Sequence, residues 1–164
     1  MCCWGPKKIL VKEEPADHAL GRSRGGYGSK IHLICDKKGH PITVDASSGQ
    51  AHESQYFEST MKRINIGGER GRPRIKPDKI AGDKAYSSSQ IRNWANGRNI
   101  VDVIPTKENE QRRSGFDKKA YRQRNVIERC IGWLKESRRI ATRFEKLAIH
   151  FLAMLKLGII LRYL

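Results

Sequence analysis

The sequence predicts an α/β fold, because segments with the period of a strand alternate along the chain with segments that have the period of a helix. Residues 29–36 alternate polar and apolar side chains, and residues 41–46 return after a Lys-Lys-Gly turn, which predicts a hairpin. Residues 79–105 contain a strand, a helix and a second strand in succession. A long amphipathic pattern occupies residues 121–140. Together these patterns predict a mixed sheet with flanking helices.

The elements between the hairpin and the last helices have local signals of their own. A helix is expected over residues 53–64, and residues 79–83, KIAGD, read as a short buried strand that ends in Asp83. Ser87 or Ser88 is suited to cap a helix over residues 89–96, and residues 99–105 predict another buried strand. Open α/β sheets place their chemistry at the carboxyl ends of strands, but Asp83 is equally suited to cap the following turn.

The C-terminal segment, residues 147–164, is very apolar. His150, Lys156 and Arg162 interrupt it, whereas a membrane-spanning helix requires about 20 apolar residues. We therefore expect a buried terminal helix and no membrane partner.

The chain is strongly basic, with 33 Lys and Arg residues against 17 Asp and Glu residues, which gives a net charge of +16. Because this excess is spread along the chain, it indicates a polyanionic partner, for which nucleic acid is a better candidate than a membrane surface. The apolar fraction of 38% excludes a disordered composition. An RNA-binding protein of the ribosomal type would carry the same charge, so charge alone does not distinguish DNA from RNA.

The cysteine pattern gives no sign of a metal or disulfide framework. Cys2, Cys3, Cys35 and Cys130 form no C-x-x-C pair, and no two histidines have zinc-finger spacing. The first ten residues also lack the apolar run of a signal peptide. Free thiols in a reducing cytoplasm are the simplest interpretation.

The helix expected over residues 121–140 has two different faces. At about 100° per residue, Arg124, Glu128 and Lys135 lie within roughly 60° of Tyr121. An acid held among fixed cations on a packed helix suits a site for a metal and a phosphate, although most such faces are simply solvated. The opposite side of the helix is apolar. Further basic residues, which follow Lys135 in the sequence, extend the charged side. The apolar residues are Val126, Ile127, Cys130, Trp133, Leu134 and Ile140, and the further basic residues are Arg138, Arg139 and Arg143.

Two basic loops supply further cations. The glycine-rich loop at residues 21–30 lets a backbone approach phosphates closely, and the Arg-Gly-Arg-Pro-Arg loop at residues 70–74 has the chemistry of a minor-groove clamp. Each is a weak signal, since a solvated basic loop would look the same. The cations of the first loop are Arg22, Arg24 and Lys30, and those of the second are Arg70, Arg72 and Arg74.

The spacing of Tyr121, Arg124, Glu128 and Lys135 resembles the signature around the last carboxylate of DDE transposases from bacterial insertion sequences. All four positions match in residue type and spacing. The segment GDKAYSS around Asp83 resembles the motif around the second carboxylate of this family. The resemblance extends over residues 19–164, so we expect a partial DDE catalytic domain there and an atypical segment at residues 1–18.

The resemblance implies a ribonuclease H-like fold and a transposase that cleaves and transfers DNA strands with Mg²⁺ or Mn²⁺. It implies that the chain binds double-stranded DNA, both at the transposon ends and at the target. It also implies assembly as a homo-oligomer or with full-length transposase. A bacterial, cytoplasmic, nucleoid-associated protein is expected. Asp83 and Glu128 would be the catalytic and metal-binding carboxylates. The DNA contacts would come from Tyr121, Arg124, Lys135, Arg138 and Arg139, together with the cations of the two loops.

The resemblance is incomplete at its N-terminal end. The first Asp and the first strand of the family precede the glycine-rich loop by some tens of residues, but the acids available here are Glu13, Glu14 and Asp17. We therefore expect a truncated copy that lacks its first strand and whose terminal helix is partly uncovered. The alternative function is that of a catalytically inactive, basic DNA-binding fragment that inhibits full-length transposase.

Overall fold

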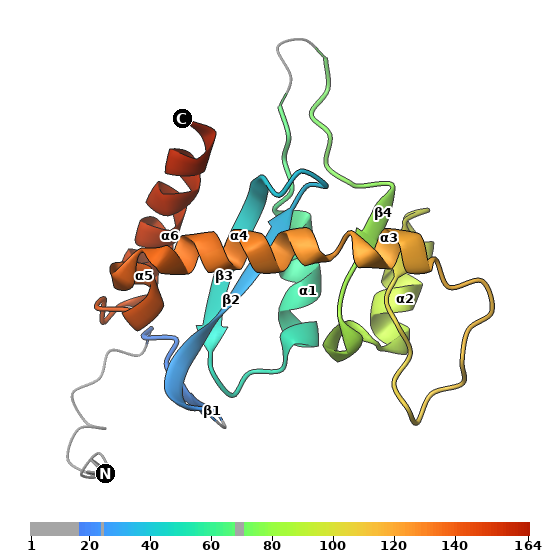
Figure 1. Cartoon of the computed structure of the whole chain (residues 1–164), viewed down its shortest axis with the longest axis horizontal. Coiled ribbons are helices and arrows are strands. Elements are labelled where there is room, and N and C mark those ends of the chain that lie inside the picture. Colours follow the sequence, from blue (N-terminus) through green and yellow to red (C-terminus); the bar gives the residue numbers. More distant parts are fainter. Residues whose placement is uncertain (1–16, 24, 68–70) are drawn as a thin grey trace.

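The computed structural model describes residues 17–23, 25–67 and 71–164 (Figure 1). The acids Glu13 and Glu14 and the cations Arg24 and Arg70 lie outside the described residues. The strands are β1 (Gly21–Ser23), β2 (Gly26–Cys35), β3 (Pro41–Ser48), β4 (Lys79–Ala81) and β5 (Val101–Val103). The helices are α1 (Glu53–Lys62), the 3-10 helix η2 (Lys84–Tyr86), α2 (Ser89–Asn96), α3 (Lys118–Arg122), α4 (Asn125–Glu136), α5 (Arg138–Thr142) and α6 (Ala148–Tyr163).

The strands form two sheets. β1, β2 and β3 are antiparallel neighbours in that order, and β4 and β5 form a parallel pair. The fold is therefore α/β, and the hairpin predicted from the sequence is confirmed. The single mixed sheet that we expected differs from the structure, because no strand among the described residues joins β2 to β4. Helix α1 contacts β2, β3, η2 and α2, and so connects the two sheets (Figure 1).

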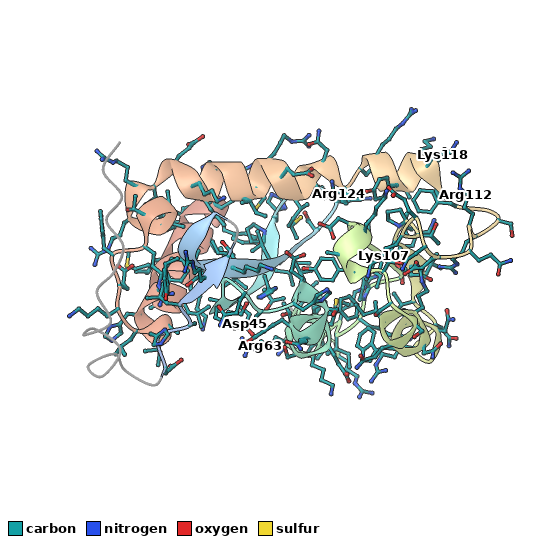
Figure 2. The ribbon with its side chains drawn as sticks, turned by 90° about the horizontal axis from the view of Figure 1, so that it is seen from below. Asp45, Arg63, Lys107, Arg112, Lys118 and Arg124 are labelled. Carbon is teal, nitrogen blue, oxygen red and sulfur yellow. The ribbon has the colours of Figure 1, made fainter. Side chains whose placement is uncertain are left out.

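One face of the hairpin is polar and meets α1. The register pairs Lys30 with Ser47 and His32 with Asp45, so these four side chains share a face. His32 is buried, hydrogen-bonds Ser47 at 2.7 Å and stacks on Tyr56 of α1 at 4.6 Å between ring centroids. Asp45 is buried beside Arg63, which follows α1, at 3.1 Å (Figure 2).

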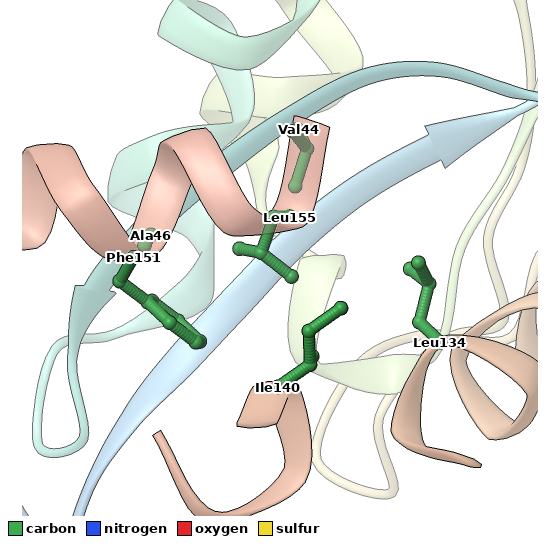
Figure 3. Packing of buried hydrophobic residues seen from close by; sticks show 6 residues of the cluster. All are labelled: Val44, Ala46, Leu134, Ile140, Phe151 and Leu155. Atoms are coloured by element: carbon green, nitrogen blue, oxygen red, sulfur yellow. The ribbon is translucent and has the colours of Figure 1, made fainter. Parts of the chain in front are cut away.

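The other face of the hairpin is apolar and carries the main core. Val44 and Ala46 of β3 pack with Leu134, Phe151 and Leu155 from the last helices (Figure 3). Ile31 and Leu33 lie opposite them in the register and pack against the same cluster. Successive side chains along a strand point to opposite faces of the sheet. Because these apolar residues face the core, the polar side chains between them face α1.

The helix predicted over residues 121–140 is wrong as one continuous element. Helix α3 ends at Arg122, α4 ends at Glu136, and the extended Ser137 (φ −71°, ψ 108°) separates α4 from α5. The turn at Ser137 lets Ile140 reach the same core cluster as Leu134. Arg143 then takes a left-handed conformation, with φ 48°, and the chain turns into α6.

Among the shorter elements, only some follow their local signals. Residues 21–30, expected as a glycine-rich loop, contain β1 and the start of β2 instead, and β4 and β5 are more exposed than the buried strands that we expected. Helix α2 begins as predicted, because the Ser88 hydroxyl accepts a hydrogen bond from the Ile91 N–H at 3.2 Å. Strands β4 and β5 are shorter than expected and end at Ala81 and Val103. Helix α6 is the expected terminal helix, and its partial exposure is confirmed, since 66% of Leu161 is accessible. In the described part of the chain, no helix is long and apolar enough to cross a membrane.

Candidate functional site

The junction between α3 and α4 preserves the spacing of the predicted catalytic face. Although the helix is interrupted there, Arg124 keeps a helical conformation, and its N–H donates to the Tyr121 carbonyl at 3.0 Å. The Arg124 guanidinium lies 5.6 Å from the centroid of the Tyr121 ring and 2.5 Å from the Glu128 carboxylate. Tyr121, Arg124 and Glu128 therefore form one contiguous group.

Electrostatics within this group favour the charged form of Arg124. Partial burial opposes the guanidinium charge, but the adjacent Glu128 carboxylate outweighs it and raises the pKa of Arg124. Half of the Glu128 side chain remains exposed. An exposed pair at this helical spacing contributes little to stability, typically about 0.3–0.5 kcal/mol, so Arg124 can exchange it for a phosphate.

Asp83 follows β4 and begins η2. Its Oδ1 accepts a hydrogen bond from the Ala85 N–H at 2.9 Å, so the carboxylate does cap the turn. Gly82 lets the Tyr86 ring pack closely against the backbone next to Asp83, because a Cβ at Gly82 would lie 3.3 Å from that ring. Capping uses one carboxylate oxygen and leaves the second available, so it is compatible with a further role.

The two predicted catalytic carboxylates differ in their surroundings. Asp83 is held by a backbone N–H and Glu128 by a guanidinium, and both are partly or wholly exposed. Among residues 17–23, 25–67 and 71–164, no group of three or more His, Cys, Asp or Glu side chains is placed to hold a metal ion. Carboxylate oxygens are the ligands that Mg²⁺ prefers, and Asp83 at the start of η2 and Glu128 in α4 both have this donor chemistry.

Four cations predicted to bind DNA have acidic partners in the structure. The pairs of Arg124 and Arg74 have an exposed carboxylate and are therefore weak, whereas the pair of Lys30 is partly buried and the carboxylate that holds Arg139 is nearly buried. The pairs are Arg124 with Glu128, Lys30 with Glu53, Arg74 with Asp78, and Arg139 with Glu145.

Four other predicted cations are exposed and free. Arg22, Arg72, Lys135 and Arg138 take part in no ion pair with any described residue. They come from β1, from the loop before β4 and from the two helices after the junction. The free charges are therefore distributed over several elements.

Arg143 does not extend the basic side of the last helices, which is a correction to the periodicity-based prediction. Its guanidinium donates to the carbonyls of His18, Ala19 and Lys146 and to the Ser29 hydroxyl. It also lies over the Phe151 ring, and burial lowers its pKa. The left-handed backbone at Arg143 directs this side chain inward, which helical periodicity does not reveal.

A buried ionic network that the sequence reasoning missed positions the loop before α3. Asp102 of β5 accepts from Arg92 of α2 at 2.7 Å and also from Arg113 of the loop, and only 3% of its side chain is exposed. Arg92 also donates to Ser87. A hollow of about 470 Å³ lies over Asp102 and Arg113, and neither Asp83 nor Glu128 lines it. The acidic residue within a segment that otherwise reads as an apolar strand was the sequence signal.

Comparisons with known proteins identify the family of the whole chain. The sequence model of the family described as "Transposase DDE domain" matches residues 8–162. The chain is also similar to the Burkholderia cepacia protein named "Putative transposase for insertion sequence element IS402". The two are 33% identical over 156 residues, which cover 94% of this chain and 68% of that protein. No solved structure matches the chain significantly. The chain therefore belongs to the family of proteins with a transposase DDE domain.

Proposed function

We propose that this chain acts in the transposition of an insertion sequence, by binding double-stranded DNA and carrying the DDE-type carboxylates Asp83 and Glu128 for strand cleavage and transfer. The observation that carries the proposal is the contiguous group of Tyr121, Arg124 and Glu128 at the α3–α4 junction. The family membership and the net charge of +16 support it.

The residues at this junction have separate roles in the proposal. The Arg124 guanidinium binds a phosphate next to the bond that is cleaved, and the Tyr121 ring keeps the guanidinium oriented. Lys135, which follows Glu128 by two turns, binds a neighbouring phosphate. Arg138 and the basic loops hold the rest of the duplex through its backbone, without reading its sequence.

Asp83 and Glu128 would hold a divalent cation through the oxygens that their present hydrogen bonds leave free. When bound, such an ion supplies Lewis-acid stabilisation of the charge that develops on phosphate oxygens. The carboxylates of this chain would orient it beside the phosphate held by Arg124.

The test is nicking of a DNA duplex that carries the ends of the element itself, with Mg²⁺ or Mn²⁺ present. Asp83→Asn is the informative variant, because an amide oxygen can still cap Ala85 while the negative charge is lost. Asp117→Asn is its matched control, since Asp117 caps α3 in the same way, with its Oδ1 accepting from the Ala120 N–H. We expect nicking to disappear in Asp83→Asn and to persist in Asp117→Asn.

Persistent nicking in Asp83→Asn would contradict the role given to Asp83. A third outcome distinguishes the alternative function. Salt-sensitive DNA binding by the unaltered chain, with no nicking under any condition, would indicate a fragment that only holds DNA, as the alternative function requires.

Glu128→Gln gives an independent prediction for DNA binding without metal. Because the change removes an acid from a basic face and releases Arg124, we expect equal or higher affinity for duplex DNA. Fluorescence anisotropy in the presence of a chelator measures this directly. A clear loss of affinity would mean that the face around Glu128 is not the phosphate site.

A further inference from the structure

A second hollow lies at the α3–α4 junction and, unlike the hollow over Asp102, its lining is basic. It has a volume of about 280 Å³ and is formed where the hairpin turn between β2 and β3 meets the start of α4. Gly39 in this turn lies against Val126, since a Cβ there would be in ordinary contact, 3.8 Å from the Val126 carbonyl, and its φ of 89° favours glycine. The hollow is lined by Lys37, Arg122, Gln123, Asn125, Val126 and Arg129.

The lining consists almost wholly of hydrogen-bond donors. Lys37, Arg122 and Arg129 carry three positive charges, and no acid is among the lining residues. Within the described part of the chain, none of these three side chains takes part in an ion pair or a hydrogen bond. Three unpaired cations around one hollow repel one another, and an anion would relieve that repulsion.

The two acids nearest in sequence to these cations already have other hydrogen-bond or ion-pair partners. The Asp36 carboxylate accepts from the N–H groups of Lys38 and His40, both at 2.8 Å, and contacts the His40 ring. Glu128, which precedes Arg129, is paired with Arg124. Neither acid can therefore neutralise the hollow without breaking bonds that it makes in the structure.

The hollow is separate from the proposed catalytic face. Ideal helical spacing places Arg129 roughly 100° around α4 from Glu128. A ligand in the hollow therefore contacts a different side of the helix from a phosphate beside Arg124, although both sites are at the same junction.

We propose that Lys37, Arg122 and Arg129 form a phosphate-binding site. Guanidinium groups match phosphate oxygens with two parallel hydrogen bonds, and Lys37 adds a point charge. The hollow is open to solvent, so it accepts a phosphate that belongs to a polymer as well as a free one. If the proposed function is correct, the phosphate that binds here belongs to duplex DNA. In this respect the inference rests on the proposed function.

The experiment compares two variants that lose the same charge. Arg122→Gln/Arg129→Gln empties the hollow of its guanidinium groups, whereas Lys146→Gln/Lys156→Gln removes two exposed charges near and on α6. Each variant is titrated with a generic duplex at several salt concentrations in a chelator. Each is also melted with and without inorganic pyrophosphate as the free-phosphate probe.

In the hollow variant, we expect the slope of log K for duplex binding against log salt concentration to become shallower by about 0.9 for each phosphate that the protein no longer neutralises. The α6 variant should leave this slope unchanged. If pyrophosphate raises the melting temperature of the unaltered chain but not of the hollow variant, and duplex binding is unaffected, the site takes free phosphate. The proposal is overturned if the hollow variant responds to both ligands as the α6 variant does.

Failure of the proposed function would give a different result. The unaltered chain would then not bind duplex DNA at all. In that case the pyrophosphate measurement would by itself decide whether the hollow is a phosphate site. Loss of pyrophosphate stabilisation in the hollow variant would support the site, and equal stabilisation of both variants would refute it.

Discussion

Arg143 connects the segment before β1 to the C-terminal helices through its bonds to His18, Ala19 and Ser29. Because hydrogen bonds from a charged donor contribute about 1.5–3 kcal/mol, and carbonyls would lose their partners, we expect Arg143→Ala to lower the free energy of unfolding by about 2–4 kcal/mol. Urea denaturation measures this. Arg138→Ala is the control and should change stability by less than about 0.5 kcal/mol, because Arg138 is exposed. Equal effects of the two changes would contradict the inward role of Arg143.

His32 should make stability depend on pH near neutrality. Burial lowers its pKa below 6.5, an effect that Asp45 and Glu53 oppose and Lys30 reinforces. Because the unfolded chain then binds more protons below pH 6.5, stability is full above that pH and falls as the pH drops toward the folded-state pKa. Carboxylates with lowered pKa lose their contribution only below about pH 4.5. Urea unfolding between about pH 7.5 and 5.5 should show this decline in the unaltered chain and not in His32→Gln. The same decline in both proteins would exclude His32 as its cause.

At the scale of elements, α6 has one buried and one exposed apolar face. Leu155 is fully buried in the core cluster, whereas 66% of Leu161 is accessible to solvent. We expect Leu155→Ala to lower the free energy of unfolding by about 2–5 kcal/mol, because it leaves a cavity. Leu161→Ala should lower it by less than about 1 kcal/mol. A large effect of Leu161→Ala, measured by urea denaturation, would mean that another surface covers this face in solution.

At the scale of the whole molecule, the net charge of +16 opposes folding through self-repulsion. Raising NaCl from about 20 mM to about 200 mM shortens the Debye length to less than about 10 Å and screens that repulsion. We therefore expect the melting temperature to rise, by about 2–4 °C for each kcal/mol of repulsion relieved. Differential scanning fluorimetry measures the shift. A falling melting temperature would mean that the surface ion pairs, which salt also weakens, outweigh the self-repulsion.

The sequence predicted the elements more reliably than the contacts between them. The alternation of residues 29–36 identified both faces of the hairpin, and Ser88, one of two predicted cap residues, is the N-cap of α2. The spacing of Tyr121, Arg124 and Glu128 identified a group that lies together in the structure. These signals are local, because they depend on backbone period and on bonds between residues three or four positions apart.

What the sequence alone determined is the hairpin, the order of most strands and helices, and the basic character that indicates nucleic acid, although it predicted a loop where β1 lies and one helix where α3, α4 and α5 lie. Only the tertiary structure decided that the helix breaks at Ser137, that Arg143 turns inward and that Lys37 meets Arg122 and Arg129 at one hollow. Periodicity places a side chain on a face of its own element. Which groups then meet depends on chain turns and on packing between residues far apart in sequence, and no local pattern records those.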